Sequence, residues 1–190
     1  TGRGASQSLT SEDATAITAL SDIAGVAPEL SRRYQVTTRG KNTNTSIVGT
    51  GPAYLSVRNV TIDEGSFFSD SQVSSRSKVA ILGPTTRDDL FGAETSPLGQ
   101  SIRVNGVDFT VIGVTKSKGG SGFANQDDTI FVPLSTMQLF LTGGEYVSTI
   151  SIQAKDQQSM TSIQEAVTGL LLDRHRISNP QQADFSVLNQ

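Results

Sequence analysis

Apolar and polar residues alternate most clearly between positions 101 and 114. At the centre of this stretch lies Asn105-Gly106, a dipeptide typical of a two-residue type I′ turn, in which both residues need a positive φ angle. Such a turn aligns three cross-strand pairs: Ile102 with Phe109, Arg103 with Asp108, and Val104 with Val107. One face of the hairpin is then apolar and the other is charged. The pattern predicts a β-hairpin that lies with its apolar face on a core.

Two stretches have the spacing of amphipathic helices. The first begins after Thr10, which is followed by Asp13 as in a capping box, and it runs to about residue 20 or 24. The second follows Asp156 and carries an apolar stripe at steps of three and four residues, formed by Met160, Ile163, Val167, Leu170 and Leu171. We expect the second helix to bury this stripe.

Short apolar runs between turn residues predict the remaining elements. Strands are expected at residues 33–38, 45–50, 79–82, 130–132, 147–154 and 185–188, with a turn at 40–44, and helices are expected at 85–91 and 136–141. Residues 53–59 fit either a short helix or a strand, and residues 70–77 have the composition of a polar connector. This mixture of strands and helices predicts an α+β fold.

The stretch from Lys78 to Ser135 resembles the extracytoplasmic core domain of MacB-type ABC transporter permeases. The resemblance rests on the order and spacing of six motifs: Val79-Ala80-Ile81-Leu82-Gly83, Leu90-Phe91-Gly92, Pro97-Leu98-Gly99, Ile102-Arg103-Val104, Phe109-Thr110-Val111-Ile112-Gly113-Val114 and Phe131-Val132-Pro133-Leu134-Ser135. It implies a discontinuous lobe beside the membrane, residues 1–75 plus 147–190, which contains a βαβ unit. It also implies an inserted mixed α/β lobe, residues 76–146, built on the hairpin.

The resemblance further implies a non-catalytic role, with no cofactor of its own. The domain would lie outside the membrane, in the periplasm or the extracellular space. There it would couple ATP hydrolysis by a cytoplasmic ABC ATPase domain or subunit to outward movement of antibiotic, peptide or lipoprotein substrates. The implied partners are the flanking transmembrane helices of the permease, a second permease copy in a homodimer, and a membrane-fusion adaptor protein.

Length and composition set limits on the class of protein. A chain of 190 residues can form one domain or two small lobes. The net charge is −3 and no basic run occurs, which argues against nucleic acid as a partner. The absence of cysteine excludes disulfides and thiol catalysis. The chain shows no apolar run of about 20 residues and no signal peptide, and it does not begin with Met. We therefore expect it to be a piece of a longer protein.

The candidate residues for catalysis or metal binding have simpler interpretations. His175 is the only histidine, and we interpret it as a surface residue near a helix C-terminus. Five acidic residues lack the spacing of a calcium loop and read as solvated groups or helix caps: Asp88, Asp89, Glu94, Asp127 and Asp128. The glycine-rich run at residues 116–123 lacks the spacing of a phosphate-binding loop. We predict no catalytic, metal or cofactor site.

The same glycine-rich loop is a candidate contact for a partner protein, because long exposed loops often carry such contacts. The candidate residues are Lys118, Gly119, Gly120, Ser121, Gly122, Phe123, Ala124 and Asn125. Phe123 stands out as an aromatic residue inside a polar loop. The other aromatic residues considered, Phe67, Phe68, Phe91 and Phe140, are expected in the core.

Two other functions stay open at this stage. A ligand-binding or sensing module would need a concave pocket with convergent polar groups, and saturable binding of a small ligand would favour it. An enzyme that uses carboxylates would need a cleft with two close acidic residues of shifted pKa.

Overall fold

The computed structural model describes residues 9–117 and 127–176. The elements in chain order are α1 (Ser11–Thr18), β1 (Ile23–Thr38), β2 (Lys41–Thr50), α2 (Tyr54–Val57), β3 (Ile62–Gly65), α3 (Asp70–Ser74), β4 (Val79–Leu82), α4 (Pro84–Phe91), β5 (Ser101–Val104), β6 (Val107–Thr115), β7 (Thr129–Pro133), α5 (Leu134–Met137), the π-helix η3 (Gln138–Thr142), β8 (Thr149–Ala154), the 3-10 turn η4 (Gln157–Ser159) and α6 (Met160–Arg174). The mixed α/β class is confirmed, with strands dominant.

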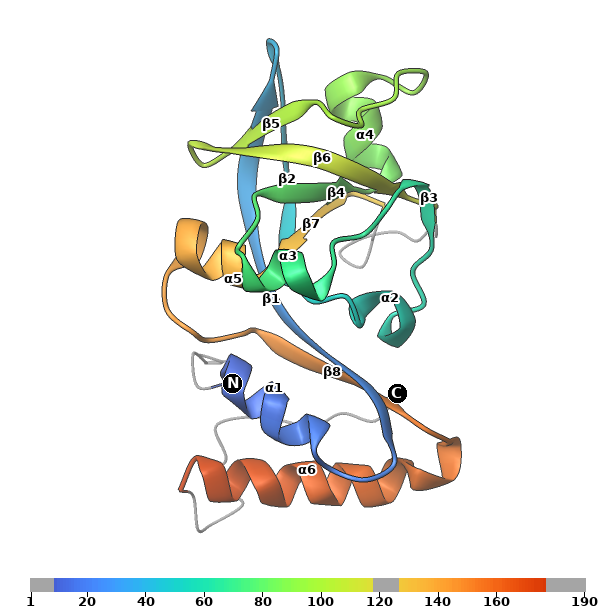
Figure 1. The fold of residues 1–190 in the computed structure, drawn as a ribbon, viewed down its shortest axis with the longest axis vertical. Helices are drawn as coiled ribbons and strands as arrows, with labels where there is room; N and C mark the ends of the chain where they lie inside the picture. Colours follow the sequence, from blue (N-terminus) through green and yellow to red (C-terminus); the bar gives the residue numbers. More distant parts are fainter. Residues whose placement is uncertain (1–8, 118–126, 177–190) are drawn as a thin grey trace.

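Six strands form a ring in the upper part of the molecule (Figure 1). Their order is β2-β7-β4-β6-β5-β1, and the pairing of β1 with β2 joins the two ends of this path. The pairs β2–β7 and β4–β6 are parallel and the other pairs around the ring are antiparallel. We call these six strands the strand ring. The short strand β3 pairs with β6 beside it.

A second, smaller layer lies at the opposite end of the long axis (Figure 1). The first part of β1, residues 23–29, pairs there with β8, and α1 and α6 pack against this strand pair through a separate apolar cluster. Its buried members are Ile17, Ile163, Val167 and Leu171. We call β8, α1, α6 and residues 23–29 of β1 the end layer. The predicted stripe of the second helix thus faces the strands with three of its five residues buried.

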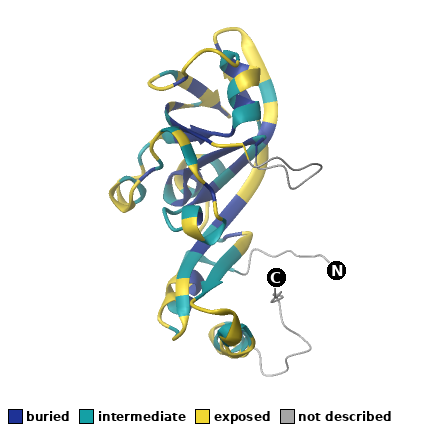
Figure 2. Cartoon of the chain, turned by 90° about the vertical axis from the view of Figure 1, so that its right-hand side faces the viewer, coloured by how far each residue is buried: buried dark blue, intermediate teal, exposed yellow. Residues whose placement is uncertain are grey.

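The predicted hairpin is confirmed residue by residue. Asn105 and Gly106 have φ angles of 48° and 82°, and the three predicted cross-strand pairs all occur in β5 and β6. The apolar face lies in the largest core cluster, where Ile102, Val104 and Phe109 are buried. Figure 2 shows this burial in the centre of the ring, with exposed residues along the outer strand surfaces.

Three local predictions are wrong. The strand expected at residues 33–38 begins at Ile23, so the residues before position 33 belong to the same long strand, β1. The first hairpin turns at Arg39-Gly40, because Thr38 pairs with Lys41, and not over residues 40–44. The expected polar connector contains the helix α3. Residues 54–57 of the undecided segment form the helix α2.

The division into two lobes stays a prediction. Strands from residues 1–75 and from residues 76–146 pair with each other, through β1–β5 and β2–β7 in the strand ring and through β3–β6 beside it. The strand expected at residues 185–188 lies outside the described residues. Within the described ranges, no helix combines the length and apolar character that crossing a bilayer requires.

Candidate functional interface

The predicted partner loop, Lys118 to Asn125, lies outside the described residues. Its two flanks are described, and they meet. The Ser117 hydroxyl donates to Asp127 Oδ2 at 2.7 Å, and the Lys116 amide donates to the Thr61 carbonyl at 2.8 Å. The loop therefore begins and ends at one place, where β6 leaves the strand ring and β7 enters it.

The five acidic residues considered for metal binding do not form one site. The Asp128 carboxylate accepts a hydrogen bond from Thr45 at 2.8 Å, and Asp88 accepts one from Arg87 at 2.8 Å. Asp127 is buried beside Ser117. In residues 9–117 and 127–176, no three His, Asp or Glu side chains lie close enough together to hold a metal ion.

His175 is not the surface residue that the sequence suggested. Its side chain is 10% exposed, and Nε2 lies 2.8 Å from Asp13 Oδ2. Arg174 Nε donates to the other oxygen, Oδ1, at 2.7 Å. Asp13 is buried in the first turn of α1, whereas both partners follow at the end of α6. The first and last helices of the described chain are therefore joined by one carboxylate.

The pKa of Asp13 reflects this environment. Burial by itself raises the pKa of the Asp13 carboxyl, because the charged form loses hydration. Hydrogen bonds from Arg174, from His175 and from the backbone amide of Thr10 act against burial and outweigh it, so that the pKa lies below its ordinary value of 3.8. The folded protein therefore holds Asp13 as a carboxylate at neutral pH.

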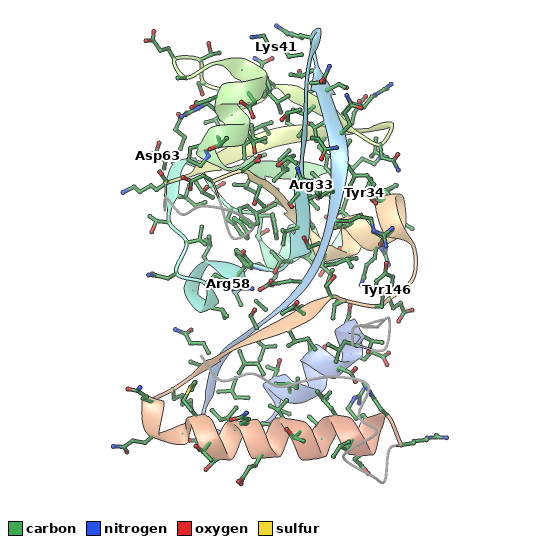
Figure 3. The ribbon with its side chains drawn as sticks, turned by 180° about the vertical axis from the view of Figure 1, so that it is seen from behind. Arg33, Tyr34, Lys41, Arg58, Asp63 and Tyr146 are labelled. Carbon is green, nitrogen blue, oxygen red and sulfur yellow. The ribbon has the colours of Figure 1, made fainter. Side chains whose placement is uncertain are left out.

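A second buried carboxylate, that of Glu29, lies where the end layer meets the strand ring. Arg58 donates to it through two nitrogens, Nε to Oε2 and Nη2 to Oε1, each at 2.9 Å. The Ser151 hydroxyl adds a third hydrogen bond, to Oε2 at 2.6 Å. Figure 3 places Arg58 at the end of α2, between the strand ring and the β1–β8 pair.

The surroundings of Glu29 are electrostatically consistent with a stable ion pair. The hydrogen bonds between Arg58 and the Glu29 carboxylate raise the pKa of the Arg58 guanidinium above its usual value. Burial of Arg58 lowers this pKa by a smaller amount. Burial raises the pKa of the nearby Tyr54 hydroxyl to about 12, and the charge of Glu29 adds to this. Tyr54 thus stays protonated and Arg58 charged, which leaves neither group available for proton transfer near neutral pH.

One aromatic residue expected in the core is exposed. Phe68 is buried and Phe67 stacks on it at 4.2 Å between ring centroids, whereas Phe140 on η3 is 37% exposed and its neighbour Leu139 is 57% exposed. The Lys78 ammonium lies 4.5 Å from the centre of the Phe140 ring. The expectation fails for Phe140 because η3 presents it at the surface, where a cation covers one ring face.

The two carboxylate clusters support a mechanical role better than a chemical one. Each carboxylate is nearly saturated by donors from its own chain, and each joins elements that are distant in sequence. Among the residues that the structure describes, neither carboxylate lies beside a second acid of raised pKa, which a carboxylate-based hydrolase would need. The clusters therefore act as connections between the first helix, the last helix and the strand ring.

Comparison with known proteins agrees with the sequence motifs. The family described as MacB-like periplasmic core domain matches residues 1–170. A macrolide export ATP-binding/permease protein MacB of Bdellovibrio bacteriovorus is 40% identical over 171 residues, which cover 90% of this chain. The MacB of Rhodospirillum rubrum is 36% identical over 188 residues, 98% of this chain. The chain spans only about a quarter of these relatives, 26% and 28% of their lengths.

Solved structures share the fold. The periplasmic region of MacB from Actinobacillus actinomycetemcomitans superimposes with a TM-score of 0.79 at 25% identity, over 88% of this chain and 75% of that one. The extracellular domain of the ABC-type transporter YknZ from Gram-positive bacteria gives the same TM-score, 0.79, at 22% identity, over 92% of this chain and 88% of that one. With the sequence match over residues 1–170, these likenesses show that the chain belongs to the family of MacB-like periplasmic core domains.

Proposed function

We propose that this chain is the outer, non-catalytic domain of an ABC-type permease. In this role it couples ATP hydrolysis by a cytoplasmic domain or subunit to outward movement of antibiotic, peptide or lipoprotein substrates. Its partners are the flanking transmembrane helices, the ABC ATPase, a second permease copy and a membrane-fusion adaptor. Family membership supports the permease assignment, and the way in which the ends of the described chain are joined supports the coupling role.

The observation that carries the proposal is the connection between α1 and α6. Asp13 of α1 binds Arg174 and His175 at the end of α6. A force that displaces one of these helices therefore displaces the other with it. From there β1 runs without a break through the end layer into the strand ring, and its 16 residues correspond to roughly 50 Å of extended chain. A movement at the membrane can thus be carried to the far end of the domain.

The two lobes are part of this proposal. Residues 1–75 with 147–190 form the lobe beside the membrane, and residues 76–146 form the lobe inserted into it. The separate apolar cluster of the end layer supports an independent core near the chain ends. The domain then moves as a lever whose base lies at α1 and α6.

The test is the removal of this chain from its parent permease. We expect a permease whose outer domain is replaced by a short Gly-Ser linker to retain ATP hydrolysis in membranes and to lose export. Export by the variant at the rate of the intact permease would contradict the proposal. Saturable binding of a small ligand by the isolated chain would instead favour a sensing module.

The loop from Lys118 to Asn125 supplies a second test, because we propose that it contacts a partner protein. Its flanks are held together by Ser117 and Asp127, so we expect a change of the residues between them to leave the fold intact. We expect replacement of Lys118–Asn125 by Gly and Ser residues to lower export at an unchanged melting temperature. A matched replacement in the exposed segment Ala93–Ser96 is the control. Full export by the loop variant would show that the loop makes no partner contact that export requires.

A further inference from the structure

The strand β1 changes its hydrogen-bonded partner at a single residue. Glu29 is the last residue paired with β8, opposite Thr149, and Leu30 is the first paired with β2, opposite Gly49. Within residues 9–117 and 127–176, one other stretch of chain links the end layer to the strand ring, between η3 and β8. A chain that passes between two sheets can change direction there, because no third strand among the described residues spans the joint.

The Glu29 side chain occupies this joint. It is 9% exposed and accepts hydrogen bonds from Arg58, at the end of α2, and from Ser151 on β8. Its backbone carbonyl accepts from the amide of Ser148, just before β8. One residue of β1 therefore contacts both units that meet at the joint.

The helix α2, which presents Arg58, packs against the strand ring. Tyr54 packs on Phe131 of β7 with 5.0 Å between ring centroids, and both residues are part of one buried cluster. At its other end α2 approaches β1 closely, since a Cβ atom at Gly25 would lie 3.0 Å from Val57 Cγ2. Arg58 thus reaches from an anchored helix to the carboxylate of the joint.

We propose that Glu29 and Arg58 form a positioning pair that fixes the orientation of the end layer relative to the strand ring. Two parallel hydrogen bonds matter here. A planar guanidinium bound to both carboxylate oxygens fixes the angle between the two side chains as well as the distance between them. Loss of the pair leaves the joint with its backbone hydrogen bonds and two hydrogen bonds that involve side chains, Thr50 Oγ1 to the Pro28 carbonyl and the Ser31 amide to Ser148 Oγ. These contacts fix the orientation less firmly, and a second orientation becomes accessible. The consequence for transport rests on the proposed coupling function.

Spin labels placed on either side of the joint test the orientation directly. The chain has no cysteine, so Ala166→Cys on α6 and Ser101→Cys on β5, both exposed positions, give one defined label pair. We expect one narrow distance distribution for the otherwise unchanged chain. In Glu29→Gln and in Arg58→Gln a second distance should appear, with a population raised roughly tenfold or more, the factor that loss of a charge-assisted hydrogen bond brings to an equilibrium.

The pair Arg103–Asp108 provides a matched control. It joins Nε to Oδ1 at 3.0 Å, but its side chains are 60% and 63% exposed and it lies within one hairpin. Arg103→Gln should leave the distance distribution unchanged. A distribution that stays narrow in both Glu29→Gln and Arg58→Gln, with both variants folded, would overturn the proposal, as would equal broadening in the control.

The same variants in the full permease separate this inference from the proposed function. If both hold, Glu29→Gln loses export while ATP hydrolysis continues, whereas a merely destabilised domain would lose thermal stability as well. A second distance with unimpaired export would uphold the positioning pair and reject the coupling role. A single distance with lost export would reject the positioning pair and leave the coupling role standing.

Discussion

Replacing Asp13 by alanine is expected to lower the free energy of unfolding by about 3 kcal/mol. Two losses add up. The Asp13 carboxylate accepts from the Thr10 amide and completes the capping box of α1, and it also binds Arg174 and His175 at the end of α6. Arg174 can turn toward water, since its side chain is 33% exposed, whereas His175 is left largely buried without its carboxylate. Urea denaturation of the two chains measures the difference.

The control for this substitution is again the exposed pair. Arg103→Ala removes an ion pair of similar geometry at the surface, where the charges are already hydrated, and should leave the unfolding curve unchanged. An Asp13→Ala chain as stable as the original would show that α1 and α6 are not held together by this carboxylate. It would then also remove the observation on which the coupling role depends.

The contribution of Asp13 has a defined pH dependence. Its pKa in the folded protein lies below the ordinary value of 3.8, so the unfolded chain takes up the proton first as the pH falls. The stabilisation is therefore complete above the ordinary value and is lost as the pH falls through the lower pKa of the folded state. The difference in unfolding free energy between the original chain and Asp13→Asn should stay constant at neutral pH and should shrink as the pH falls below the ordinary value of 3.8.

Elements specified by neighbouring residues were predictable from the sequence. Asn105-Gly106 fixes its hairpin because both residues tolerate a positive φ, and the register follows from the two-residue loop. Thr10 and Asp13 fix the start of α1 in the same way, through the capping box that the structure contains. The helix α3 was within reach by the same rule, since Ser69 and Gln72 form a second capping box.

The long strand β1 was not predictable by local rules. Gly25 and Pro28 lie within it, and both residues ordinarily mark a break. Pro28 is tolerated because it pairs with Ile150 at the end of a two-stranded segment. Gly25 leaves room for α2, since a Cβ atom there would lie 3.0 Å from Val57 Cγ2. Both reasons depend on elements that come later in the chain. Tertiary contacts therefore override the local signals here.

The two carboxylate contacts could not be predicted from the sequence for a related reason. Asp13 and Arg174 are 161 positions apart, and Glu29 and Arg58 are 29 apart, so no motif of fixed spacing announces either pair. His175 read as a surface residue because a basic Arg-His-Arg run at a helix end is usually solvated. Only the return of α6 to the first turn of α1 gives it a buried carboxylate partner. The family could be recognised from motifs, whereas its internal connections required the fold.

Replacing Gly113 by alanine is expected to lower the free energy of unfolding by about 3 kcal/mol. Its position on β6 faces β3 at close range. A Cβ atom there would lie 2.5 Å from the Ser66 carbonyl oxygen and 3.2 Å from that of Glu64, and both contacts are backbone atoms that no rotamer change can move away. The opposing residue, Gly65, already has a φ angle of 70°, and a Cβ atom there would lie 2.1 Å from the Ile112 carbonyl oxygen of β6. The clash must therefore displace β3.

The displacement is costly because the chain after β3 supplies the second core cluster. Phe68 is buried there and stacks on Phe67, so moving β3 loosens the packing of both rings. The matched control is Gly169→Ala on α6, where nothing lies near the added methyl group and the helix gains about 0.5–1 kcal/mol. Urea denaturation should therefore move the two alanine variants in opposite directions. A stabilising effect of Gly113→Ala would show that β3 does not approach β6 this closely. The packing of Phe67 and Phe68 against the strand ring would then not depend on that approach.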